Sequence, residues 1–288
     1  MIPAVFDGDR WIDEPCDPSR GTETPAELVI ATLNVWFAPF ERVARQEAIL
    51  RELESLGADL IALQEVEATL MARLLGRPWV REGYYLSTRD PRSLGSYGTL
   101  LLSRFPLHRL ERVELPTVMG RDLLIAEISS YGQRARLGVV HLESTRGMAA
   151  TRVAQLGRVM SALTDAPTAV LLGDHNFDPS WPEQAALDAR YVDAWTRVHG
   201  DAPGWTEDTE RNPMRRLVHD DERKVRFDRI LVRSDDWAPI ETRLFADRPI
   251  APALPMVFPS DHFGVVTRLA PRGARSAAAE GAIEEGRK

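Results

Sequence analysis

The apolar positions of this chain follow two patterns, which are short continuous runs and segments with helical spacing. Helical spacing predicts two helices, one at 41–56, which ends before Gly57, and one at 148–163. Short apolar runs separated by Gly and Pro predict strands at 28–36, 59–66, 97–103, 123–129, 136–141, 168–172, 226–233 and 264–269. Because helices and antiparallel-looking strands are mixed along the chain, we expect an α/β (α+β) fold of two packed mixed β-sheets flanked by helices.

The two ends of the chain lack this periodicity. Residues 1–26 mix Pro, Asp, Thr and Gly, and we expect them to form a flexible acidic leader. Residues 271–288 are rich in Ala, Gly and Glu and are expected to form a disordered tail. The remaining residues, 27–270, are predicted to form one folded domain.

The composition is typical of a soluble globular protein. The 288 residues are 44% apolar and 27% charged, which excludes collagenous, disulfide-stapled and disordered chains. The longest apolar stretch, 28–40, is interrupted by Thr32 and Asn34 and is shorter than the roughly 20 residues of a membrane span. No secretory signal is visible, and Cys16 is the only cysteine, so we expect a reducing, cytoplasmic location without a membrane partner.

The net charge of −7 argues against non-specific binding along a nucleic acid, because such binding neutralises many phosphates with Lys and Arg. Residues 1–26 contain six acidic and two basic residues and so hold more than half of this charge. The acidic total is therefore weak evidence against a partner that is held at one end through a few phosphates.

Short polar clusters stand at the ends of five predicted strands. They are Asn34, Gln64 to Glu65, His141 to Ser144, Gly173 to Asn176 and Ser260 to His262. Strand ends on one side of a sheet can assemble a site from distant parts of the chain. These clusters carry the hard oxygen ligands that Mg²⁺ or Mn²⁺ prefers. No cysteine takes part and no HExxH spacing occurs, so a tetrahedral zinc site is not favoured.

Five short motifs follow one another between residues 28 and 269. They are Thr32-Leu33-Asn34, Leu63-Gln64-Glu65-Val66, Gly173-Asp174-His175-Asn176, Arg226-Phe227-Asp228-Arg229 and Ser260-Asp261-His262. In this order they resemble the endonuclease/exonuclease/phosphatase superfamily. The resemblance implies a four-layer sandwich of helices and two sheets, and it implies that domain 27–270 is a catalytic domain for metal-dependent phosphoester hydrolysis.

A second set of stretches narrows the resemblance. It comprises His141 to Gly147 with Ala149, Ala150 and Arg152, then Trp205-Thr206 before Asp208-Thr209, and finally Phe258 to His262. These stretches are similar to those of the tyrosyl-DNA phosphodiesterase 2 branch. That likeness implies a monomeric DNA-repair hydrolase, dependent on Mg²⁺ or Mn²⁺, that cleaves a phosphoester at DNA 5′ ends.

The resemblance assigns the metal and the attacking water to five polar residues. Glu65 is the expected direct metal ligand, Asn34 supports the metal or a phosphate oxygen, and Asp261 orders metal-bound water. Asp174 is expected to activate the attacking water, and Asn176 to hold that water or a phosphate oxygen. Taken alone, the residues also permit an exposed strand-end acid at 65 and plain turns at 34 and 174–176.

His262 and Asp228 form a second predicted unit. By the same resemblance, His262 stabilises negative charge on the phosphate while Asp228 orients its imidazole and favours the protonated ring. An ion pair of Asp228 with Arg226 or Arg229 is the alternative, and both arrangements can coexist.

Five further residues are implied to bind substrate. His141, Ser144 and Arg121 are expected phosphate contacts, and Trp205 is expected to line the channel and stack on a base or ring. His175, between the two functional residues of its motif, could add a ligand or a second acid. A helix cap at Ser144 and a core position for Trp205 remain alternatives.

One residue departs from the tyrosyl-DNA pattern. The related enzymes place an arginine two residues after the motif's asparagine, where this chain has Asp178. An acid there repels a substrate phosphate, although Arg121 matches the branch and can compensate. Two alternatives therefore stay open. One is a phosphatase or phosphodiesterase for a small phosphorylated metabolite or lipid headgroup, and the other is a catalytically silent binding module of the same fold.

Overall fold

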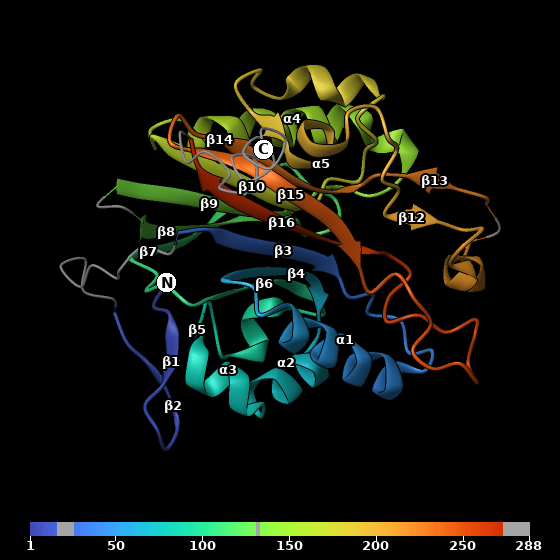
Figure 1. Ribbon diagram of the computed structural model, residues 1–288, viewed down its shortest axis with the longest axis horizontal. Helices are drawn as coiled ribbons and strands as arrows, with labels where there is room; N and C mark the ends of the chain where they lie inside the picture. The colour runs from blue at the N-terminus through green and yellow to red at the C-terminus, as the bar shows by residue number, and fades with distance from the viewer. Residues whose placement is uncertain (16–25, 131–132, 220, 273–288) are drawn as a thin grey trace, which may run out of the picture.

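Two large β-sheets pack face to face in the computed structural model, with helices on their outer faces (Figure 1). The structure describes residues 1–15, 26–130, 133–219 and 221–272. The arrangement confirms the predicted fold class of two packed mixed sheets flanked by helices. Residues 16–25 of the expected leader and residues 273–288 of the expected tail lie outside the described residues.

The larger sheet has eight strands in the spatial order β15-β16-β3-β4-β6-β5-β1-β2. Its strands are β1 (Ala4–Phe6), β2 (Trp11–Asp13), β3 (Leu28–Asn34), β4 (Leu60–Val66), β5 (Tyr85–Leu86), β6 (Gly98–Ser103), β15 (Trp237–Phe245) and β16 (Gly264–Pro271). β3 and β4 are parallel neighbours with Asn34 opposite Gln64. Their carboxyl ends therefore bring Asn34 and Glu65 to the same edge of the sheet.

The smaller sheet has six strands in the order β11-β14-β10-β9-β8-β7. Its strands are β7 (Arg109–Glu114), β8 (Asp122–Ser130), β9 (Gln133–His141), β10 (Thr168–Asp174), β11 (Val192–Asp193) and β14 (Asp228–Arg233). Asp174 lies opposite His141 on the parallel strand β9 and opposite Asp228 on the antiparallel strand β14. Register alone thus sets three predicted site residues in one row. A separate ribbon pairs β12 (Glu207–Asp208) with β13 (Lys224–Val225).

Helices complete the layers. Below the larger sheet in Figure 1 lie α1 (Arg42–Leu56), α2 (Ala68–Leu75) and α3 (Pro78–Gly83). Above the smaller sheet lies α4 (Ala149–Leu163), while the short α5 (Ala194–His199) contacts β14 and β15. The short 3₁₀ turns are η1 (Pro91–Leu94), η2 (Arg146–Met148), η3 (Pro182–Ala186) and η4 (Pro213–Leu217). Within the described residues, no helix combines the length and apolar character needed to cross a membrane.

Strand periodicity divides the apolar residues among separate cores. In β3, Leu28 and Ile30 face the core between the two sheets, whereas Ala31 and Leu33 face α1 to α3. A third cluster, which includes Leu156 of α4, covers the other face of the smaller sheet. Both sheets are therefore buried on both faces, which explains why their strands appear in the sequence as continuous apolar runs.

The expectation of a flexible leader is wrong for residues 4–13. β1 pairs with β2 and with β5, which extends the larger sheet by two strands. Ala4 is fully buried in the core beneath that sheet. Strands of three residues are too short to produce a recognisable period in the sequence, so the hydrophobic pattern could not reveal them.

The row of site residues depends on a glycine immediately before Asp174. Gly173 has a φ of +133°, and a Cβ at this position would lie 2.0 Å from the carbonyl oxygen of Val140. Because the backbone would have to shift, we expect Gly173→Ala to lower the free energy of unfolding by at least about 2 kcal/mol in urea denaturation. The control is Gly157→Ala in α4, where a Cβ meets nothing within 4 Å. It should stabilise the protein by up to about 1 kcal/mol, and equal effects would contradict the argument.

Candidate active site

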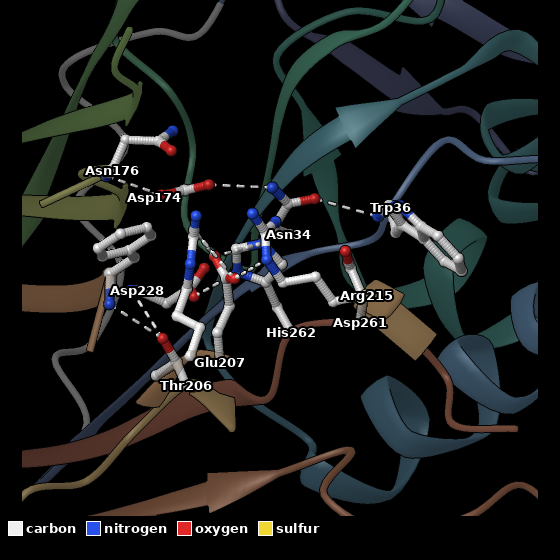
Figure 2. A network of polar contacts seen from close by, with 12 residues as sticks. Asn34, Trp36, Asp174, Asn176, Thr206, Glu207, Arg215, Asp228, Asp261 and His262 are labelled. Atoms are coloured by element: carbon white, nitrogen blue, oxygen red, sulfur yellow. Dashed lines mark hydrogen bonds and ion pairs between the residues drawn. The ribbon is translucent and has the colours of Figure 1, made fainter. Parts of the chain in front are cut away.

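The polar strand ends of both sheets converge on one place (Figure 2). They are contributed by β3 (Asn34), β4 (Glu65), β9 (His141), β10 (Asp174), β14 (Asp228) and the loop before β16 (Asp261 and His262). All seven side chains are buried or nearly so. The site therefore lies at the seam where the two sheets meet, and most of the residues predicted from separate motifs are neighbours.

Asp174 is held by hydrogen bonds on both carboxylate oxygens. Asn34 Nδ2 donates to Oδ2 at 3.0 Å, and the backbone N–H of Asn176 donates to Oδ1 at 2.8 Å. Burial opposes the charge, but the nearby His141 and His262 and these hydrogen bonds outweigh it and lower the pKa of Asp174. The carboxylate is therefore ionised at neutral pH and able to accept a proton.

Asn176 forms a turn and also lies beside Asp174, so both interpretations that the sequence left open apply to it. Its φ of +53° lies in the left-handed region, which Asn tolerates better than most residues. Its Nδ2 donates to the carbonyl of Leu142 at 3.0 Å, so the side chain is fixed beside Asp174. Asn34 is fixed in the same way, since its Oδ1 accepts the Trp36 N–H at 3.0 Å.

His262 is oriented by Asp228. Its Nδ1 donates to Asp228 Oδ2 at 2.7 Å, as the sequence predicted. Burial disfavours the imidazolium, but Asp228 and the other carboxylates around the ring raise the pKa of His262 well above its usual value of 6.5. The alternative pairing of Asp228 is wrong, because Arg226 and Arg229 bind Asp193 instead, at 2.7 and 2.8 Å. His262 is therefore a cationic donor whose Nε2 remains for a ligand.

His141 has the opposite protonation. Arg121 Nη1 lies 3.0 Å from His141 Nδ1, and because a guanidinium can only donate, the ring carries its proton on Nε2. Burial, aided by Arg121, lowers the pKa of His141 to about 3, so the ring is neutral. Its Nε2–H faces Asp174 Oδ2 at 3.4 Å and Glu65 Oε1 at 3.9 Å. Arg121 also donates to Ser144 Oγ at 3.0 Å, and Ser144 caps no helix.

Glu65 reaches the site through an irregular strand. The pairing of β4 with β6 shifts register between Leu63 and Val66, and the φ of Glu65 is +61°. Such an irregularity re-aims a side chain that strict alternation would send elsewhere. Oε2 accepts the Phe37 N–H at 3.1 Å, which fixes the carboxylate.

The buried acids of the site suit a divalent cation. Burial raises the pKa of Glu65, and burial raises the pKa of Asp261 to about 7, as expected for carboxylates that have lost water without gaining a full counter-charge. Asp174, Asp228 and His262 also place one polar atom each within 4.8 Å of one another, but the protonated His262 has no lone pair for a metal. The oxygen-rich donors fit a hard ion and not a thiolate-bound metal.

Glu207 of β12 is a site residue that sequence reasoning missed. Its Oε1 lies 3.5 Å from His262 Nε2 (Figure 2). Its Oε2 is flanked by Arg223 Nη1 at 3.2 Å and Arg215 Nε at 3.4 Å. It lies within the 205–209 stretch that carried part of the resemblance, and that location was the signal that could have revealed it. Only the fold aims it at His262.

A groove of about 340 Å³ opens beside the site and was not predicted either. Next to Asn176, its lining combines three cationic side chains with aromatic rings and two acids. The cations are Arg146, Arg223 and Lys224, the rings are those of Trp181 and the buried Phe227, and the acids are Asp221 and Glu222. Arg146 lies over the Trp181 ring at 5.2 Å and Arg223 over the Phe227 ring at 5.3 Å. Basic side chains alternating with ring faces are typical of surfaces that bind single-stranded nucleic acid.

His175 does not belong to this site, and the prediction that it contacts substrate is wrong. Its ring is fully buried against Phe177, and Nδ1 lies 3.0 Å from the carbonyl oxygen of Gly173, two residues earlier in the chain. Burial, with the nearby Arg229, lowers the pKa of His175 to about 3. His175 directly follows the last residue of β10, and its ring lies in the core whereas Asp174 and Asn176 on either side face the site.

Two other predicted residues have definite surroundings. Trp205 is half-buried with Lys224 Nζ 5.0 Å from its ring centroid, and it lies outside the hydrophobic clusters of the described residues. Asp178 accepts the N–H groups of Arg226 and Ser180, each at 3.0 Å, and the Ser180 hydroxyl at 2.7 Å. The Asp178 carboxylate therefore accepts three hydrogen bonds from the protein, and the one from Arg226 fastens the segment before β14.

Comparison with known proteins places this geometry among relatives. The model of the Endonuclease/Exonuclease/phosphatase family matches residues 31–262. The chain is 30% identical to human Tyrosyl-DNA phosphodiesterase 2 over 235 residues, which cover 78% of this chain and 63% of that protein. The chain thus spans less than two thirds of the length of that relative.

Solved structures of similar fold include a humanized TDP2 of D. rerio, with a TM-score of 0.72, 26% identity, and coverage of 85% of this chain and 99% of that one. The D. rerio TDP2 complexed with single strand DNA product has a TM-score of 0.74 and 24% identity with the same coverage, and it supports the fold.

The buried neutral His175 should make the protein sensitive to acid. A histidine whose folded pKa is depressed to about 3 adds stability that is present above pH 6.5 and is lost as pH falls, because only the unfolded chain takes up the proton. Between pH 7.5 and 5.0 this loss is about 2 kcal/mol for one such residue. In urea denaturation, His175→Gln should therefore lose about 2 kcal/mol less over this range than the parent protein. His219→Gln, at an exposed position, is the control; a parent-like loss in His175→Gln would refute the assignment.

Proposed function

The chain belongs to the endonuclease/exonuclease/phosphatase family, and on that premise we propose that it is a metal-dependent phosphodiesterase that hydrolyses a phosphoester at DNA 5′ ends. Support for the substrate comes from the relatives, one of which is named Tyrosyl-DNA phosphodiesterase 2 and one of which holds a single strand DNA product. A 5′-tyrosyl-DNA end is therefore the specific substrate that we propose.

The observation that carries the proposal is an ionised, hydrogen-bonded Asp174 carboxylate near one neutral and one cationic histidine, beside a groove that contains three cationic side chains. Asp174 faces the His141 Nε2–H at 3.4 Å, and His262 offers a second donor at Nε2. The groove begins at Asn176, next to Asp174. A phosphate at the seam would therefore meet donors on several sides, while the attached strand would have a path away from it.

The residues support in-line attack by water. Asp174 accepts a proton from the water as its oxygen bonds to phosphorus, and the bond from phosphorus to the leaving oxygen breaks on the opposite side. Asn34 and Asn176 orient the water or a phosphate oxygen. His262 and His141 donate to the non-bridging oxygens, where negative charge develops. Arg121 keeps the His141 proton on Nε2 and so keeps this donor directed at the phosphate.

Glu65 would hold the cation directly, with Asn34 beside it and Asp261 acting through bound water. We propose Mg²⁺ or Mn²⁺, because the donors are oxygens and because burial leaves these acids short of a counter-charge. When bound, such an ion supplies electrostatic stabilisation of the phosphate and the leaving oxygen.

The groove supports a polynucleotide over a free phosphorylated metabolite. Trp181 is partly exposed and offers a ring on which a base can stack, and Arg146 and Lys224 can neutralise phosphates. Trp205 lies against Lys224 and could extend this surface. Asp178 weighs less against DNA than its charge suggests, since its oxygens already accept three hydrogen bonds.

A substrate panel with Mg²⁺ tests the proposal. We expect turnover of a 5′-phosphotyrosyl oligonucleotide, followed by release of its 5′-phosphorylated product, and no turnover after chelation. An abasic duplex, phosphoinositides and sugar phosphates form the other arms. Turnover of the small phosphates alone would replace DNA with a metabolite or lipid headgroup, and no metal-dependent turnover on any substrate would favour a binding module.

Asp174→Asn tests the mechanism separately. Removal of the base should lower kcat by at least about 100-fold while the melting temperature and metal binding stay near those of the parent protein. Asp188→Asn, which alters an acid paired with Arg190 at the surface, is the matched control. Retention of more than about a tenth of the rate by Asp174→Asn would contradict its role as the base.

A further inference from the structure

One carboxylate stands where the phosphate of the proposed reaction must bind. His262 uses Nδ1 for Asp228, so Nε2 is the nitrogen left for a phosphate oxygen. Glu207 Oε1 lies 3.5 Å from that nitrogen, which is an ion-pair distance and too long for a good hydrogen bond (Figure 2). Any phosphate oxygen that accepts from Nε2 will therefore lie close to the Glu207 carboxylate.

Glu207 has little freedom to leave this position. It is only 3% exposed, and its backbone is fixed in β12 opposite Val225 of β13. Arg223 Nη1 lies 3.2 Å and 3.4 Å from its two oxygens, and Arg215 Nε lies 3.4 Å from one of them. A side chain held among packed groups cannot retreat into water when a second anion arrives.

The two arginines beside Glu207 are shared with a second carboxylate and so leave no excess positive charge there. Both also pair with Asp221, Arg215 through Nη2 at 3.3 Å and Arg223 through Nη2 at 3.2 Å. Two guanidinium groups therefore serve two carboxylates. The four groups together carry no net charge, and the one nearest to His262 Nε2 is the negatively charged Glu207 carboxylate.

We infer that Glu207 makes the site distinguish phosphates by charge, so that it accepts the singly charged phosphodiester and expels the doubly charged monoester. The inference rests on the proposed function, in which water adds to phosphorus and the bond to the leaving oxygen breaks. The leaving oxygen departs with a proton, and the new terminal phosphate, whose second pKa is about 6, loses a further proton to solvent at neutral pH. Hydrolysis therefore adds one negative charge beside Glu207, and like charges at this distance repel.

This role is one of specificity and product release. Glu207 raises the cost of binding the product more than the cost of binding the substrate, because repulsion scales with the charge of the phosphate. A terminal phosphate already present on DNA would be disfavoured in the same way. Glu207 thus favours diester cleavage over monoester cleavage in a site whose other residues could serve either.

Binding measurements separate this inference from catalysis. In the Asp174→Asn background, which keeps the diester intact, calorimetry with Mg²⁺ at pH 8 compares two ligands. One is a trinucleotide with a 5′-phosphate, and the other is the same trinucleotide with a 5′-methyl phosphodiester. Addition of Glu207→Gln should tighten binding of the monoester about tenfold and change binding of the diester by less than about threefold.

Glu210→Gln is the matched control, since Glu210 follows the same ribbon but is exposed and pairs with Lys224. It should leave the ratio of the two affinities unchanged. If Glu207→Gln does not fold, Glu207→Asp is the second variant, because its shorter side chain withdraws the carboxylate from His262. It should also strengthen binding of the monoester relative to binding of the diester. If the parent protein cleaves the diester but Glu207→Gln leaves the ratio of the two affinities unchanged, this inference alone is overturned. If the protein binds neither ligand, the proposed function is overturned as well.

Discussion

A hydrogen bond between the two sheets is the interaction on which the site depends. Asn34 ends a strand of the larger sheet and donates to Asp174, which ends a strand of the smaller one, at 3.0 Å. The apolar core between the sheets sets their separation, and register places His141 and Asp228 beside Asp174. A site built at such a seam is positioned by regular elements on both sides and is therefore held more rigidly than one on loops alone.

Electrostatic surroundings then give similar side chains different tasks. His262 and His141 are both buried within one site, yet neighbouring carboxylates outweigh burial and make the first a cation, whereas burial, aided by the Arg121 guanidinium, keeps the second neutral. Asp174 is ionised while Asp261 has a pKa raised to about 7. Environments that push the pKa values of neighbouring groups apart are how one fold supplies both acids and bases at neutral pH. The protonation state of a histidine or an aspartate in this site therefore cannot be inferred from its residue type.

The distribution of charge matters more than its sum. The chain as a whole is acidic, with a net charge of −7, yet the groove next to the site collects Arg146, Arg223 and Lys224 around aromatic faces. The acids that would hold a cation are buried in the site, whereas the groove beside it carries three cationic side chains together with the acids Asp221 and Glu222. A local arrangement of this kind is compatible with a substrate held at its end and not along its length.

The sequence by itself predicted the central strands of both sheets and most of the polar residues that meet at their seam, because long apolar runs and strand-end polar motifs are local signals. It did not reveal β1 and β2, whose three residues each carry no period, or the longer strands β7 and β15. It also assigned His175 to substrate, although that ring, just beyond the end of β10, lies in the core. Only the tertiary structure decided the protonation of His141, the hydrogen bond that Asp178 accepts from Arg226 and the approach of Glu207 to His262. Each depends on a partner far away in the chain or on another strand, and the physical reason is the same throughout: burial and neighbouring charge are properties of packing, which residue identity alone does not specify.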